Sequence, residues 1–268
     1  MITNRFGIPE DLAAMISEDR KKADPARFSV TKLLLPTRIA VLAETEEPIE
    51  DVSDSYLAFL GSCVHFWLEY HRRGFGEIKL ETRLGEDTVV GVVDRFDPDT
   101  GTITDYKTKR CSDTSYEDAA KQIKCYAWML RRMGHIASKG RVVVFRRDWS
   151  KLRNRNQPPV EEIEFPILPD DIEWAEGFVK ERIAAIKAGR KSLPECSPEE
   201  KWYTGDEWAC YKKEGDERAA RVFRTEEEAN AFGFVVRKRE GKDLRCESFC
   251  PYARVCRLKR QQKTKQTI

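Results

Sequence analysis

Two aspartates and a lysine lie on either side of a predicted turn in GVVDRFDPDTGTITDYKT, residues 91–108. Side chains alternate along a strand, so Asp105 and Lys107 point the same way, and a hairpin around DPDTG can bring Asp94 across to them. Two converging carboxylates repel each other unless they are protonated or share a cation, and Mg2+ binds a few carboxylates, water and phosphate oxygens. A lysine beside them could hold or polarise an attacking water. The spacing fits a hydrolytic metal site, or else a solvated hairpin with an ion pair.

The elements that would position these side chains follow from the periodicity of the sequence. Alternating polarity and β-branched residues predict a three-strand meander at 77–84, 88–96 and 102–108, with further strands at 141–147 and 160–167. Apolar residues at helical spacing predict helices at 9–22, 51–73, 116–133 and 169–189. Ser53 or Asp54 is expected to cap the helix at 51–73. Gly134 is expected to end the helix at 116–133 and Gly189 the helix at 169–189. Pro36 is expected to interrupt the segment 28–44.

The composition indicates a globular chain whose overall charge names no partner. The 268 residues are 40% apolar, and 48 Lys and Arg against 46 Asp and Glu leave a net charge of +2. The sequence has neither a run of about eighteen apolar residues nor the apolar core of a signal peptide, so we expect no membrane partner and a cytoplasmic location. The eight cysteines are then expected to be reduced thiols or metal ligands.

Four motifs in order resemble those of the PD-(D/E)xK nuclease superfamily, in its RecB-like exonuclease branch. GVVDRFDPDTGTITDYKT resembles motifs I and II of that superfamily. A G-xxx-H pattern on the preceding helix is matched by Gly61 and His65, and a Q-xxx-Y pattern on the following helix by Gln122 and Tyr126. The resemblance covers roughly residues 29–147, and it places the protein in a bacterial or phage-infected cell.

The resemblance and the chemistry of the side chains together indicate a divalent metal site. Asp94 and Asp105 offer hard oxygen ligands for Mg2+ or Mn2+, and the backbone carbonyl of Tyr106 would add a third. His65 resembles the histidine ligand of the branch, and its imidazole favours Mn2+. Glu81 on the preceding strand is a further candidate ligand, although an exposed strand acid fits the pattern equally well.

The remaining motif residues are expected to act on the substrate. Lys107 would orient the attacking water for metal-assisted phosphodiester hydrolysis, with no covalent intermediate. Gln122 and Tyr126 are four residues apart, so they share one helical face, where an amide and a phenol can position the scissile phosphate or the lysine.

The C-terminal cysteines have the spacing of metal ligands. Cys246, Cys250 and Cys256 are separated by three and five residues, and Cys196 lies upstream. Four thiolates suit zinc or an iron–sulfur cluster, and ligand softness does not separate the two. The similar AddB nuclease domain and CRISPR adaptation exonucleases hold a 4Fe-4S cluster, which the resemblance therefore implies here, with Zn2+ or free thiols as alternatives. Those families take the distant cysteine from before the core, so Cys210 remains a rival of Cys196.

A basic segment with interspersed aromatic residues is the candidate nucleic-acid contact. Cations neutralise phosphates, and aromatic rings stack on unpaired bases, so binding should weaken steeply with salt; a solvated loop is the alternative. The candidate residues are Arg146, Arg147, Lys151 and Arg153, with Phe145 and Trp149 among them.

These features predict an α/β restriction-endonuclease-like fold, a mixed sheet flanked by helices, over 1–190. A C-terminal cysteine-bound metal or Fe-S module with a small α/β insertion and a basic tail follows over 191–268. The expected function is a metal-dependent DNA exonuclease in phage or mobile-element recombination, repair or other DNA processing. The alternatives are a non-catalytic DNA-binding subunit and a zinc-stapled interaction module. DNA with a single-stranded portion is the expected substrate, and a recombination or single-strand-binding protein the implied partner.

Overall fold

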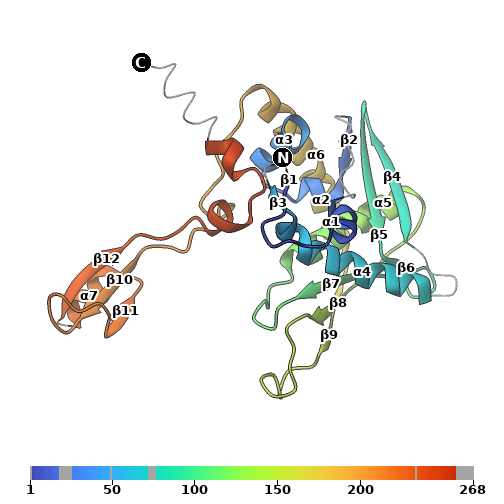
Figure 1. Ribbon diagram of the computed structural model, residues 1–268. Helices are drawn as coiled ribbons and strands as arrows, with labels where there is room; N and C mark the ends of the chain where they lie inside the picture. Colours follow the sequence, from blue (N-terminus) through green and yellow to red (C-terminus); the bar gives the residue numbers. More distant parts are fainter. Residues whose placement is uncertain (1, 18–25, 49, 72–76, 233, 258–268) are drawn as a thin grey trace. The chain divides into compact units, whose positions relative to one another are not determined.

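The computed structural model describes residues 2–17, 26–48, 50–71, 77–232 and 234–257 (Figure 1). The chain forms two compact units, residues 1–194 and residues 195–268. Among the described helices, none is both long enough and apolar enough to cross a membrane.

The first unit is built on two mixed sheets. The three-stranded sheet has the order β2-β5-β4, with β2 parallel and β4 antiparallel to β5. Its strands are β2 Arg27–Ser29, β4 Ile78–Leu84 and β5 Asp87–Val93. The four-stranded sheet has the order β6-β7-β8-β9, in which β7 and β8 are parallel; its strands are Arg95–Asp97, Thr102–Lys109, Lys139–Arg146 and Val160–Pro166. A short parallel pair joins β1, Ile2–Thr3, to β3, Glu50–Asp51.

The predicted three-strand meander is wrong at one residue, Asp94. β5 ends at Val93 and β6 begins at Arg95, so the expected strand 88–96 is divided between the two sheets. The hairpin around DPDTG is confirmed. β6 pairs antiparallel with β7, and the pair next to the turn is Asp97 with Thr102. Periodicity could not reveal the break, because the apolar alternation continues through it.

The described residues of the first unit form seven helical segments. They are α1 Glu10–Ser17, α2 Val30–Leu33, α3 Thr37–Thr45, the 3-10 turn η1 Val52–Ser55, α4 Tyr56–His71, α5 Glu117–Arg132 and α6 Pro169–Lys191. The interruption at Pro36 is confirmed, whereas residues 18–22 of the first predicted helix lie outside the described residues. The predicted cap at Ser53 or Asp54 is wrong, because the N-cap of η1, which leads into α4, is Asp51. The Asp51 carboxylate accepts a hydrogen bond from Ser53 N, and the Asp54 carboxylate accepts one from Asp51 N.

Gly189 does not end the last helix of this unit, contrary to the prediction. α6 continues to Lys191, and Gly189 lies inside it. A Cβ at this position would lie only 3.0 Å from Val41 Cγ2 and 3.2 Å from Thr37 Cγ2. The glycine therefore lets α6 pack closely against α3, a tertiary requirement that resembles a stop signal in the sequence.

The core of the first unit is formed by α5 and α6 against the sheets. α5 contacts β4, β7, β8 and α6, and it carries fully buried side chains such as Trp128 and Met129. Each buried side chain of this size contributes roughly 1.5–3 kcal/mol. This packing fixes α5, and with it the side chains that α5 directs toward β7.

Helices α4 and α5 cover opposite faces of β7. A Cβ at Gly61 of α4 would lie 3.5 Å from Thr108 Oγ1, while Lys107, the preceding residue, bonds to Gln122 of α5. Successive strand side chains point to opposite faces, so β7 lies between the two helices. The candidate residues from both helices therefore meet at one strand.

In the part of the second unit that the structure describes, there is a small antiparallel sheet, one α-helix and a π-helical turn. Its strand order is β11-β10-β12, and α7 packs against all three strands. The elements are β10 Glu207–Tyr211, β11 Arg221–Phe223, α7 Glu226–Ala231, β12 Val235–Arg239 and the π-helical turn η2 Arg245–Phe249.

Candidate active site

Strand β7 supplies three consecutive candidate residues, Asp105, Tyr106 and Lys107. β7 lies between β6 and β8, and Asp105 is only 3% exposed. Burial raises the pKa of Asp105 to about 6; the Lys107 ammonium opposes this rise and the negative charge of Asp94 adds to it. A carboxyl group in such surroundings binds a proton or a cation more readily than one in water.

Asp94 occupies the break between β5 and β6, where its two carboxylate oxygens contact different residues. Its Oδ2 accepts a hydrogen bond of 2.7 Å from the backbone N–H of Tyr106, beyond the point where β6 stops pairing with β7. Its Oδ1 lies 3.2 Å from Nδ1 of His65. The strand break thus places one carboxylate over the middle of β7.

His65 reaches the same place from α4. Its Nε2 lies 3.0 Å from the carbonyl oxygen of Tyr106 and its Nδ1 faces Asp94, so both ring nitrogens have acceptors. The hydrogen bond with Asp94 raises the pKa of His65, and burial and the charge of Lys107 oppose the rise. The ring therefore lies between two of the oxygens expected to bind a metal.

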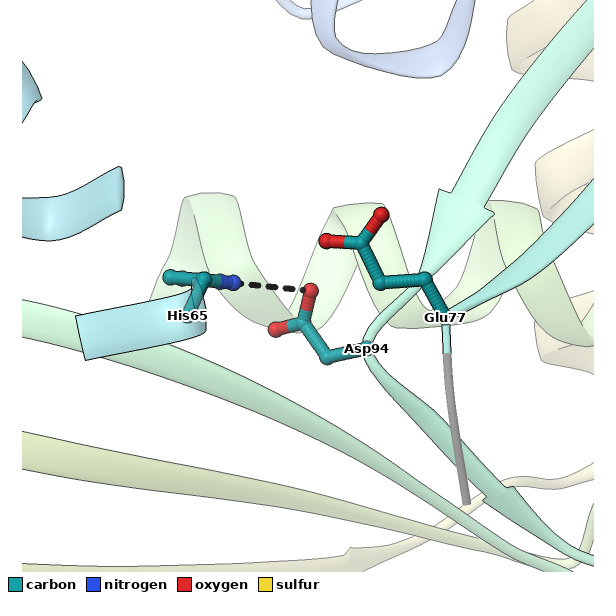
Figure 2. Close-up of side chains that lie close together, drawn as sticks. All are labelled: His65, Glu77 and Asp94. Carbon is teal, nitrogen blue, oxygen red and sulfur yellow. Dashed lines mark ion pairs between the residues drawn. The ribbon is translucent and has the colours of Figure 1, made fainter. Parts of the chain in front are cut away.

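Glu77 is a site residue that sequence reasoning missed. One ligand atom from each of His65, Glu77 and Asp94 lies within 4.8 Å of the other two, and the three side chains converge in Figure 2. Burial raises the pKa of Glu77, and the charges of Glu69 and Asp94 raise it further. The sequence carried no signal for it, because the pairing of Ile78 with Val93, which places the preceding residue opposite Asp94, is known only from the folded sheet.

Glu81, the acid predicted on this strand, is placed elsewhere. Its Oε2 accepts a 2.9 Å hydrogen bond from Arg27, and both side chains are about half exposed. Glu81 pairs in register with Val90, three residues before the end of β5 at Val93. The structure therefore brings Glu77, and not Glu81, to Asp94.

A chain of hydrogen bonds links the lysine to helix α5. Lys107 Nζ donates to Asp105 Oδ1 at 2.8 Å and to Gln122 Oε1 at 3.1 Å, and Gln122 Nε2 donates to Tyr126 Oη at 2.7 Å. Burial raises the pKa of Tyr126, so its phenol stays protonated at neutral pH. A Cβ at Gly91 would lie 2.7 Å from the Tyr126 ring, so this glycine makes room for the ring against β5.

The residues present fit a hard divalent cation. His65, Glu77 and Asp94 each place one ligand atom within 4.8 Å of the other two. Asp105 lies outside that group, and both of its oxygens are 2.8 Å from Lys107 Nζ. Carboxylate and carbonyl oxygens with one imidazole are a ligand set for Mg2+ or Mn2+.

Comparison with known protein families identifies the superfamily of the chain. The model of the PD-(D/E)XK nuclease superfamily matches residues 18–257, nearly the whole chain. The chain belongs to the PD-(D/E)XK nuclease superfamily. Membership supports a nuclease enzyme that acts on DNA, in a superfamily whose members typically use divalent metals, on a mixed α/β fold.

Two solved structures are similar to this nuclease-superfamily chain at low sequence identity. The crystal structure of SSO0001 is 20% identical with a TM-score of 0.47, over 67% of this chain and 87% of that chain. A phage-related exonuclease from Haemophilus somnus 129PT is 13% identical with a TM-score of 0.36, over 67% of this chain and 97% of that chain. No curated protein sequence matches the chain.

Arg146 is not available to nucleic acid in this nuclease-superfamily chain, contrary to the prediction. It is 6% exposed, and its guanidinium donates to the carbonyls of Arg110 and Asp113, to Tyr116 and to Glu161. It therefore fastens the loop between β7 and α5. Basic residues at strand ends look alike in sequence whether they face inward or outward.

The rest of the basic segment is exposed, apart from its aromatic residues. Arg147, Lys151 and Arg153 are exposed at the end of β8 and in the following loop. Phe145 and Trp149 are only partly exposed, and Trp149 Nε1 donates to the carbonyl of Gln157 at 2.7 Å. The cationic part of the predicted contact is accessible, whereas the indole is held within its own loop.

Two of the predicted cluster cysteines act on a third in the second unit. Burial raises the pKa of Cys250, and the charges of the Cys246 and Cys256 thiols raise it further. Among the described residues, the group whose ligand atoms lie within 4.8 Å of one another is His65, Glu77 and Asp94, and it contains no cysteine. Cys196 is partly buried in the same unit. Cys210 is fully buried in β10, where its thiol lies 3.5 Å from the carbonyl of Ala229.

Proposed function

We propose that the protein is a divalent-metal-dependent DNA exonuclease of the RecB-like branch. The observation that carries the proposal is the meeting of His65, Asp94 and the Tyr106 carbonyl at β7, beside the Asp105–Lys107 pair. The four motifs come from four different elements, and the fold joins them through direct contacts. An incidental ion pair would not require this convergence.

The ligands of the metal would be His65, Asp94, Asp105 and the carbonyl of Tyr106, with Glu77 as an added carboxylate. When bound, a divalent ion would lower the pKa of the attacking water and stabilise the negative charge that develops on the phosphate oxygens. The His65 ring is already aimed at this place by its contacts with Asp94 and Tyr106. Little reorganisation of the protein is therefore needed for binding.

Lys107 is the residue that would act directly on the nucleophile. Its ammonium is held by Asp105 and by the amide oxygen of Gln122, and Tyr126 fixes that amide by accepting from its NH2 group. Held in this way, the ammonium can donate to attacking water and stabilise negative charge without first losing rotamer freedom. Gln122 and Tyr126 act here as positioning residues.

The test is digestion of end-labelled single-stranded and double-stranded DNA with Mg2+ or Mn2+. We expect release of labelled nucleotides from one end by the wild type and loss of this activity in Lys107→Ala. Lys139→Ala is a matched control, since Lys139 is a half-exposed lysine of β8 that forms an ion pair with Glu164. Wild-type protein that binds DNA but releases no nucleotide would instead be a non-catalytic DNA-binding subunit, and internal fragments without end release would identify an endonuclease.

We also propose that Cys196, Cys246, Cys250 and Cys256 hold a 4Fe-4S cluster. The spacing of the last three cysteines and the charge effect of Cys246 and Cys256 on Cys250 support the proposal, and the burial of Cys210 in a strand favours Cys196 as the fourth ligand. Such a cluster would fasten the C-terminal segment and would not need to transfer electrons. Its ligands are thiolates, whereas the active site offers oxygen and imidazole, so the two sites select different metals.

Metal analysis of anaerobically purified protein tests the cluster. We expect brown protein with iron and sulfide, and loss of both in Cys250→Ser but not in Cys210→Ser. Zinc without visible absorbance would mean a zinc site, and retention of iron by Cys250→Ser would contradict the proposed ligands.

A further inference from the structure

The sheet of the second unit carries two arginines on the face that α7 does not cover. Cys210 of β10 faces α7, because its thiol lies 3.5 Å from a carbonyl oxygen of that helix. Side chains alternate along a strand, so Tyr211 points to the opposite face, which we call the open face. Tyr211 pairs in register with Val235 of β12, so Arg237 and Arg239, two and four residues further along β12, lie on the open face as well.

The ring of Tyr211 is a base for both guanidinium groups. The guanidinium carbon of Arg237 lies 4.5 Å from the centre of the ring, and that of Arg239 lies 5.7 Å from it. Arg239 also donates a hydrogen bond of 2.6 Å to Tyr211 Oη. Tyr211 is only 5% exposed, whereas both arginines are exposed. The two guanidinium groups are therefore held in a fixed arrangement and still reach solvent.

Nearby carboxylates do not compensate these two charges. Neither Arg237 nor Arg239 forms an ion pair with any residue that the structure describes. Glu207 is an acid of the open face, but its carboxylate lies 3.2 Å from Arg224. Arg237 approaches Asp216 only at its backbone carbonyl, at 3.4 Å. The open face is therefore cationic.

The arrangement of the arginines fits a ligand with phosphate groups. Two guanidinium groups on one ring repel each other, and an anion between or beside them removes that repulsion. Each guanidinium presents N–H donors in a planar fork, which binds phosphate or carboxylate oxygens at two points. Because stacking on Tyr211 already restricts both side chains, little conformational entropy remains to be lost when the anion binds.

The opposite face of the module indicates how a polyanion would approach it. Three consecutive exposed acids, Glu226, Glu227 and Glu228, begin α7, which covers the other face of the sheet. These carboxylates repel phosphates, so a polyanion is directed to the open face. An acidic peptide carries similar charges, but DNA is favoured because the same chain is proposed to act on DNA.

We propose that Arg237 and Arg239, stacked on Tyr211, bind phosphates of the DNA backbone through the open face of the second unit. The proposal rests on the proposed nuclease function and adds a DNA-binding surface to a unit whose other expected role is to hold a metal or cluster. A contact with phosphates reads no bases, so it holds DNA regardless of sequence.

The test measures binding of a fluorescein-labelled DNA duplex by anisotropy over a range of salt concentrations. No Mg2+ or Mn2+ is added, so no cleavage is needed. Each phosphate contact contributes about 0.9 to the slope of log affinity against log salt, so Arg237→Gln with Arg239→Gln should reduce this slope by about 1.8. The affinity at low salt should fall by about tenfold or more. Arg237→Lys with Arg239→Lys should keep most of the slope, because both charges remain.

The matched control is Arg221→Gln. Arg221 is an exposed arginine of β11 that also lies over an aromatic ring, 5.0 Å from the centre of Phe223. It pairs in register with Cys210 and therefore lies on the face toward α7. This variant should keep both the affinity and the slope of the wild type.

An unchanged slope and affinity in the double glutamine variant, or an equal loss in Arg221→Gln, overturns the proposal. So does a double variant that loses affinity only for a fluorescein-labelled polyglutamate peptide, because the ligand would then be an acidic protein. With Mn2+ and saturating DNA, the double variant should digest at the rate of the wild type, since neither arginine belongs to the active site. Failure of the wild type itself to digest DNA would refute the nuclease proposal without changing the binding result.

Discussion

Replacing Asp105 by Asn should make the unfolding free energy of the metal-free protein less dependent on pH. The pKa of Asp105 is raised from its ordinary value of 3.8 to about 6 in the folded protein, mainly by burial. Between these two values the folded state holds a proton that the unfolded chain has released. Stability from this group is therefore complete below about pH 4 and is lost as the pH rises through about 6.

The expected size of the effect follows from the two pKa values. One pKa unit corresponds to about 1.4 kcal/mol, so the gap between 3.8 and about 6 corresponds to about 3 kcal/mol. The difference in unfolding free energy between wild type and Asp105→Asn should then fall by this amount from pH 4 to pH 7.5. Acids elsewhere titrate in both proteins, so they cancel in the difference.

Urea unfolding in EDTA across this pH range measures the effect, and Mn2+ provides the second arm. Added Mn2+ should stabilise the wild type above pH 6, because a cation replaces the proton, and should stabilise Asp105→Asn much less. Asp97→Asn is a matched control, since Asp97 is an acid of the neighbouring strand β6 whose pKa is lowered and not raised. A wild-type minus Asp105→Asn difference that stays flat with pH would refute the reasoning.

Three further changes test the site and its support. Lys107→Ala should reduce the cleavage rate by about a hundredfold or more while Mn2+ still raises the melting temperature, because we propose that the lysine acts on the nucleophile and not on the metal; loss of the Mn2+ effect would contradict that division. Glu77→Gln should weaken Mn2+ binding, measured by calorimetry, by about tenfold or more, whereas Glu81→Gln should leave it unchanged; equal effects would remove Glu77 from the ligand set. Arg146→Met should lower the unfolding free energy in urea by about 2–3 kcal/mol, less than for a fully buried pair because Glu161 is about one-third exposed; a neutral effect would mean that Arg146 does not fasten the loop.

Much of the site could be predicted because its residues are fixed by local spacing. Asp105 and Lys107 are two residues apart on a strand, and Gln122 and Tyr126 are four residues apart on a helix. The members of each pair therefore share one face of their element, which the sequence spacing alone predicts. The structure joins the two pairs through the bond between Lys107 and Gln122. The prediction that His65 approaches Asp94 depended on the motif resemblance, because no local rule links residues from a distant helix and strand.

The parts that could not be predicted depend on register and on burial. Glu77 and Glu81 are both acids of the same segment, and only the pairing of Ile78 with Val93 decides which of them faces Asp94. Arg146 and Arg147 are adjacent arginines, yet the first is buried and the second exposed. Strand alternation predicts that they differ, but not which one faces inward.

The strand break at Asp94 connects the fold of the first unit to its chemistry. In an unbroken strand, a backbone carbonyl would accept the hydrogen bond of the Tyr106 N–H. Here the carboxylate of Asp94 accepts it instead, at 2.7 Å. A hydrogen bond to a charged group contributes about 1.5–3 kcal/mol, which offsets the lost strand pairing. Because the same carboxylate also faces His65, the interaction that repairs the sheet also orients the imidazole that we propose as a metal ligand. The site is thus preorganised by the requirement that a buried backbone donor be satisfied, and a carboxylate meets that requirement where an apolar residue of the same alternation could not.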